Sequence, residues 1–156
     1  MVAVVDSLSV LVVDEEPEVL SFFARLLDAN DMRALLARNA VEAIGIAKRG
    51  YVPIDLVVTD VALRAETSGP EVTGGHDLIA LIRELRPDTR ALFMSACLDA
   101  GVVRIELMDR AVETNSKNPD DAGLIDSIRL AVTRPIVTVR QVSACVFRRC
   151  EYRIPV

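Results

Sequence analysis

The sequence contains no tryptophan, and aromatic residues make up only 4% of its 156 residues. The core must therefore be aliphatic, and the aromatic platforms on which single-strand nucleic-acid binders stack bases are scarce. Its three cysteines are an odd number without CxxC spacing, so neither a disulfide framework nor a zinc site is indicated. No apolar run approaches the roughly 20 residues that cross a bilayer. We expect reduced thiols, a cytoplasmic protein and no membrane contact.

Basic side chains are also in the minority, and the formal net charge is −5. Residues 134–156 hold five arginines and one glutamate, whereas residues 1–133 hold 13 basic and 22 acidic side chains. An acidic body has no bulk attraction to phosphate backbones, so we expect no direct nucleic-acid binding. The sequence predicts an N-terminal extension at 1–8, one domain at 9–133 and a basic C-terminal tail at 134–156 in which no further domain is recognisable.

Short apolar runs alternate with amphipathic segments along the domain. The run at 9–13 is apolar on both faces, which is typical of a central parallel strand. We expect strands at 9–13, 32–37, 54–60, 91–94 and 111–114, and helices at 17–27, 40–49, 77–85, 98–108 and 120–132. This alternation predicts an α/β fold with a doubly wound, five-stranded parallel sheet and helices on both faces.

Polar side chains follow the expected strands. Asp14 and Glu15 come after the first, Asp60 ends the third, Ser95 ends the fourth and Lys117 follows the fifth. In such sheets ligands bind beyond the carboxyl ends of the strands. Three carboxylates meeting there would repel one another without a cation, and a few carboxylates with waters form the typical magnesium site. A carboxylate beside such an ion can act as a nucleophile and form an aspartyl phosphate.

The sequence resembles the receiver domains of response regulators, a family with the flavodoxin-like fold. Four motifs carry the resemblance in order: SVLVVDEEP at 9–17, DLVVTD at 55–60, ALFMSA at 91–96 and Lys117. It covers about residues 9–133 and implies the strand order 2-1-3-4-5. The chain departs from the family where Asn118 rather than proline follows Lys117, and where Thr114 replaces the usual aromatic residue.

The resemblance implies a role for each residue at this edge. Asp60 would accept the phosphoryl group, Ser95 would be the switch hydroxyl, and Lys117 would bind the phosphoryl oxygens. The ligands of a Mg²⁺ ion would be Asp14, Glu15, Asp60 and the backbone carbonyl of Ala62. The phosphoryl donor would be a sensor histidine kinase or a phosphotransfer protein.

The expected function is that of a stand-alone receiver in a two-component phosphorelay, which signals to an unknown protein target by direct contact. Whether it forms a homodimer is left open. It would be no enzyme beyond its own phosphorylation and a slow dephosphorylation, because Ala62 and Cys97 cannot readily position an attacking water. The alternative is a receiver-like binding module that works without phosphorylation. The roles of the 64–76 loop, where His76 is expected to be exposed, and of the 134–156 tail are left open.

Overall fold

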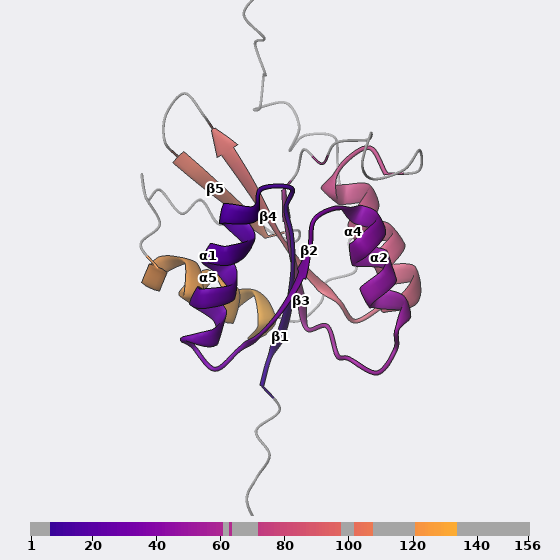
Figure 1. The fold of residues 1–156 in the computed structure, drawn as a ribbon, viewed down its shortest axis with the longest axis horizontal. Helices are drawn as coiled ribbons and strands as arrows, with labels where there is room; N and C mark the ends of the chain where they lie inside the picture. The colour runs from indigo at the N-terminus through magenta and orange to yellow at the C-terminus, as the bar shows by residue number, and fades with distance from the viewer. Residues whose placement is uncertain (1–6, 61–62, 64–71, 98–101, 108–120, 134–156) are drawn as a thin grey trace, which may run out of the picture.

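A computed structural model describes residues 7–60, 63, 72–97, 102–107 and 121–133, and it shows a central sheet between two layers of helices (Figure 1). The strands are β1 (Ser9–Val13), β2 (Arg33–Ala37), β3 (Leu56–Asp60), β4 (Arg90–Cys97) and β5 (Val102–Leu107). The helices are α1 (Pro17–Asp28), α2 (Ala40–Lys48), α4 (Gly75–Leu85) and α5 (Asp121–Thr133). The strand order is β2-β1-β3-β4-β5, and the order of the first four strands confirms the predicted flavodoxin-like α/β class. Within the described ranges, none of the helices has the length and apolar character needed to cross a membrane.

Local sequence signals set the ends of the first two helices. Pro17 occupies the first turn of α1, where its missing N–H leaves no hydrogen bond unmade. Asn39 is the N-cap of α2, and its side-chain oxygen accepts a hydrogen bond from the Glu42 N–H at 2.9 Å. Gly50 follows α2 with φ +68°, the left-handed conformation that glycine adopts most readily. The sequence predicted the roles of Pro17, Asn39 and Gly50.

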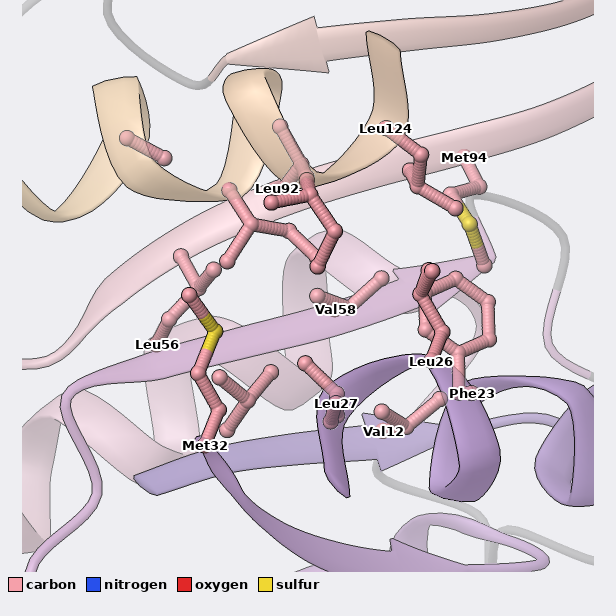
Figure 2. Close-up of a cluster of buried hydrophobic side chains, with 14 of the residues drawn as sticks. Val12, Phe23, Leu26, Leu27, Met32, Leu56, Val58, Leu92, Met94 and Leu124 are labelled. Atoms are coloured by element: carbon pink, nitrogen blue, oxygen red, sulfur yellow. The ribbon is translucent and has the colours of Figure 1, made fainter. Parts of the chain in front are cut away.

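One apolar core lies between the sheet and helices α1 and α5. Figure 2 shows Val12 of β1, Val58 of β3 and Leu92 of β4 among its side chains. Phe23 from α1 and Ile128 from α5 are nearly or fully buried in the same cluster. Because alternate strand residues point to opposite faces, each central strand contributes every second residue here.

A second core lies on the other face, beneath helices α2 and α4. Here Leu11, Val57 and Phe93 come from the central strands, and Leu78 and Ile79 come from α4. Helix α2 contributes three alanines, so it approaches the sheet with little side-chain volume: Ala40, Ala43 and Ala47. Burial on both faces explains why the central strands read as nearly continuous apolar runs.

The last strand differs from the prediction. β1, β2, β3 and β4 are mutually parallel, but β5 is antiparallel to β4, with Cys97 opposite Val102. Residues 102–107 were expected to lie in a helix, and that prediction was wrong. β-branched residues dominate this segment and favour a strand. The connection at 98–101 is also far shorter than the dozen or so residues that a parallel crossover needs. The strand expected at 111–114 lies outside the described residues.

Candidate functional site

Two carboxylates stand side by side at the carboxyl edge of the sheet. The last register pair of the β1–β3 ladder joins Val13 of β1 to Thr59 of β3. Asp14 follows Val13, and Asp60 follows Thr59. Neighbouring strands lie about 4.8 Å apart, so this register brings the two acids next to each other. The Asp14 N–H also donates to the Ala37 carbonyl at 3.1 Å, which ties Asp14 to β2 as well. The register therefore places Asp14 and Asp60 beside each other, and their roles in a site stay predictions.

The environment of Asp14 opposes its negative charge. Burial raises the pKa of the half-buried Asp14 carboxyl above its ordinary value. A hydrogen bond from the Glu16 N–H, 2.9 Å from Oδ1, acts in the opposite direction. The charges of Asp60, Glu16 and Glu15 raise the pKa further. A cation at this edge would relieve the repulsion that Asp14 experiences.

The acidic residues 14–16 also form the approach to α1. The Glu16 carbonyl accepts hydrogen bonds from the N–H groups of Val19 and Leu20, at 3.1 and 3.2 Å. Acids are favoured at such a position because the N-terminus of a helix carries partial positive charge. Glu15 is half-buried and Glu16 is exposed. The same residues thus begin the helix and supply negative charge beside Asp60.

A divalent cation fits this edge in part. Mg²⁺ keeps several of its waters and is commonly held by one or two carboxylates, so the chemistry of the Asp14–Asp60 pair is compatible with such an ion. Across the described part of the chain, no group of three His, Cys, Asp or Glu side chains is close enough to hold a metal ion. The roles of Asp14, Glu15 and Asp60 as metal ligands therefore stay predictions. Ala62 and Lys117 lie outside the described residues.

Ser95 lies one residue beyond the partner of Asp60 in β4. Asp60 pairs with Met94 across the parallel β3–β4 ladder, and Ser95 is the next residue of β4. On its other side Ser95 pairs with Arg104 of β5. The backbone of Ser95 therefore lies next to the end of β3, but β4 continues to Cys97, so the prediction that Ser95 ends the fourth strand was wrong. Its role as a switch hydroxyl stays a prediction.

The start of α4 reaches this edge too, and the sequence did not reveal it. Gly75 is buried. A Cβ atom added there would lie less than 3.0 Å from the Asp60 carbonyl oxygen, closer than real Cβ atoms approach other atoms. Two consecutive glycines before an amphipathic run were the only available signal, and they were interpreted as part of a loop. Gly75 is therefore a residue of the site that only the tertiary structure shows.

His76 is also different from the expectation. It lies in α4, is half-buried, and its ring packs against Phe93 with 4.2 Å between ring centroids. The prediction of an exposed loop residue was wrong. Just before the helix, Thr73 donates from both its N–H and its hydroxyl to Asp77 Oδ2. These hydrogen bonds hold the pKa of the Asp77 carboxyl below its ordinary value.

A doubly wound sheet with an acidic pair at the ends of β1 and β3 defines a receiver-like domain. The family model for the response regulator receiver domain matches residues 10–129. The chain belongs to this family, whose members are signalling domains of two-component systems. A search of curated proteins finds no match.

Solved structures agree in fold. The response regulator receiver protein from Sinorhizobium medicae WSM419 is 22% identical, with a TM-score of 0.59 over 81% of this chain and 95% of that chain. The receiver domain of the hybrid histidine kinase CckA is 24% identical, with a TM-score of 0.58 over 80% of this chain and 98% of that chain. The two component transcriptional regulator AraC from Clostridium phytofermentans ISDg is 25% identical, with a TM-score of 0.55 over 81% and 92% of the two chains.

Proposed function

We propose that this receiver domain accepts a phosphoryl group on Asp60 in a Mg²⁺-dependent reaction. The observation that carries the proposal is the adjacency of Asp14 and Asp60, in which the charge of Asp60 contributes to raising the pKa of Asp14. Placing two half-buried carboxylates side by side lowers the stability of the folded protein, because their negative charges repel each other. Binding of a cation and reaction with a phosphoryl group would account for this arrangement. The donor class is a sensor histidine kinase or a phosphotransfer protein.

Phosphoryl transfer requires only one covalent step from the protein, the attack of a carboxylate on phosphorus. An Asp60 carboxylate oxygen forms a bond to phosphorus as the bond between phosphorus and the donor's histidine nitrogen breaks, and that nitrogen then takes up a proton. Bound Mg²⁺ would neutralise charge on the phosphoryl oxygens. Asp14 would hold the ion, with Glu15 and the Ala62 carbonyl as further ligands. The rest of the catalysis is positioning.

Ser95 and Lys117 complete the proposal. The Ser95 hydroxyl would donate to the phosphoryl group from β4, and the Lys117 ammonium would pair with its oxygens. Movement of Ser95 toward the phosphoryl group would shift the population between two packings of the domain. We assign this receiver to residues 9–133 and propose that it works alone, passing its signal by contact with another protein.

Intact-mass analysis after treatment with acetyl phosphate tests the acceptor. The wild-type protein should gain the mass of one phosphoryl group with Mg²⁺ and not with EDTA. Asp60→Asn should gain none, whereas Asp88→Asn should behave as wild type because exposed Asp88 lies in the turn after α4. A phosphorylated Asp60→Asn protein, or an unmodified wild type, would overturn the proposal.

One observation favours a second candidate, a receiver-like module that binds its partner without phosphorylation. β5 runs antiparallel to β4, whereas the resemblance implied a fully parallel sheet beside Ser95. Backbone NMR spectra recorded with beryllofluoride and Mg²⁺ separate the two candidates. Shifts of the resonances of residues 14, 60 and 95 that are absent in Asp60→Asn support phosphoacceptance, and unchanged spectra support the binding module.

A further inference from the structure

We propose that the first turn of α4, through Gly75 and His76, is a positioning element that holds Asp60 in place for phosphoryl transfer. This inference rests on the proposed function, because it concerns the placement of the proposed acceptor. None of the four sequence motifs that carry the family resemblance includes residues 73–77. The inference comes from how α4 meets the end of β3.

The peptide of Asp60 is enclosed on two sides. From α4, Gly75 lies so close that an added Cβ would overlap the Asp60 carbonyl oxygen and approach its carbonyl carbon to 3.3 Å. From β3 itself, the hydroxyl of buried Thr59 donates to the same carbonyl oxygen at 3.2 Å. The Thr59 methyl carbon would lie 3.1 Å from that added Cβ, so it closes the remaining space. Only a residue without a side chain allows α4 this close to Asp60.

The turn that carries Gly75 is itself fixed by three contacts. The ring of His76 packs on Phe93 at 4.2 Å between centroids with 30° between the planes, and Phe93 is the register partner of Thr59. Thr73 donates its N–H to Asp77 Oδ2 at 2.9 Å, and its hydroxyl donates to the same oxygen. The His76–Phe93 contact ties α4 to β4, and the two hydrogen bonds between Thr73 and Asp77 stiffen the turn itself. A turn stiffened in this way cannot retreat from Asp60 without breaking the contact between His76 and Phe93.

Displacement of this turn would move the acceptor carboxylate, because the carbonyl that Gly75 contacts and the reacting carboxylate share one Cα atom. An added methyl group at Gly75 needs 3.4 Å or more for an ordinary contact, so α4 and Asp60 must separate. A misplacement of about 1 Å can reduce the rate of a positioned reaction roughly 100-fold. The proposal therefore predicts a loss of phosphorylation rate in a protein that remains folded.

The test compares two glycines that both lie inside helices. Gly75→Ala places a methyl group against Asp60, whereas Gly45→Ala in α2 is the matched control because nothing lies within 4 Å of its added Cβ. Each purified full-length protein is treated with acetyl phosphate and Mg²⁺ well below its melting temperature, and intact mass gives the rate per folded molecule. We expect Gly75→Ala to react about 10 to 100 times more slowly than wild type, and Gly45→Ala within about twofold of it.

A second pair of variants decides the case if Gly75→Ala does not fold. His76→Ala removes the ring from Phe93, and His76→Phe keeps an aromatic ring there. We expect His76→Ala to lower the phosphorylation rate severalfold and His76→Phe to restore most of that rate. If His76 only stabilised the fold, the rate per folded molecule would be the same in both variants and in wild type. Equal rates for His76→Ala and wild type would overturn the role of His76.

The outcomes separate this inference from the proposed function. If wild type is phosphorylated, Asp60→Asn is not, and folded Gly75→Ala reacts as fast as Gly45→Ala, the positioning role fails and the acceptor assignment stands. If the wild-type protein takes up no phosphoryl group under any of these conditions, both fail together. A slow Gly75→Ala beside a normal Gly45→Ala supports both.

Discussion

Asp14 lies beside Asp60 because each is the residue after the last pair of the β1–β3 ladder. The adjacency has an energetic cost, since burial and the neighbouring charges raise the pKa of Asp14. The cost falls on a residue that also ties the end of β1 to β2 through its N–H. The proposed phosphoacceptor site rests on this energetically costly adjacency of two carboxyls.

Replacing Asp14 with asparagine should stabilise the protein at neutral pH when divalent ions are absent. The raised pKa means that the folded chain binds the Asp14 proton more tightly than the unfolded chain does. The protein therefore loses stability as the pH rises from the pKa of Asp14 in the unfolded chain through its higher pKa in the folded chain. At neutral pH this loss is complete. Asparagine stays neutral and can still accept the Glu16 N–H, so Asp14→Asn avoids this loss.

Thermal melts in EDTA from pH 3 to pH 8 measure this effect. The melting temperature of Asp14→Asn should exceed that of wild type at pH 7, and the difference should shrink as the pH falls below the ordinary carboxyl range. Asp88→Asn is the control, because Asp88 is exposed. A less stable Asp14→Asn protein at pH 7 would contradict the electrostatic argument.

Alanine at the two helical glycines should change stability in opposite directions. Gly45→Ala should stabilise the protein by about 0.8–1.0 kcal/mol, because alanine has the higher helix propensity and its methyl group meets nothing within 4 Å. Gly75→Ala should destabilise it by about 1–3 kcal/mol, because the methyl group overlaps backbone atoms of Asp60. Urea denaturation of both variants measures the two free energies of unfolding, and a change of the same sign in both would refute the contact.

The N-cap of α2 offers a prediction that is independent of the site. Asn39→Ala removes the side-chain oxygen that accepts the Glu42 N–H at 2.9 Å and should cost about 1 kcal/mol. Asn39→Ser retains a capping oxygen and should cost much less. Urea unfolding curves of the two variants give the comparison, and equal losses would mean that the hydrogen bond contributes little.

Local signals were sufficient for much of the fold. The run at 9–13 was recognised as central because it is apolar on both faces, and both faces of β1 are buried in the structure. Asn39 and Gly50 act within a single turn of the chain, so their roles could be read directly from the sequence. The meeting of Asp14 and Asp60 followed from a rule of parallel sheets, that their carboxyl ends share one edge.

Other features depend on contacts between distant segments. The residues at 102–107 fit either a short helix or a strand, and pairing with β4 decides between them. The closeness of Gly75 to Asp60 depends on how α4 packs against β3, which no local pattern encodes. His76 was misassigned for the same reason, because its partner Phe93 comes from another strand.

Magnesium should raise the melting temperature of the wild-type protein, and this effect should require Asp14. An ion that binds only the folded state stabilises it in proportion to the logarithm of its concentration, by about 2.7 kcal/mol at 100 times its dissociation constant. Bound Mg²⁺ would also screen the charges that raise the pKa of Asp14, so wild type should gain more from the ion at pH 7 than at pH 4. Asp14→Asn and Asp60→Asn should lose most of the gain, while Asp88→Asn should keep it. A melting temperature that rises equally with Mg²⁺ in all four proteins would mean that the ion binds elsewhere and that the acidic pair does not form its site.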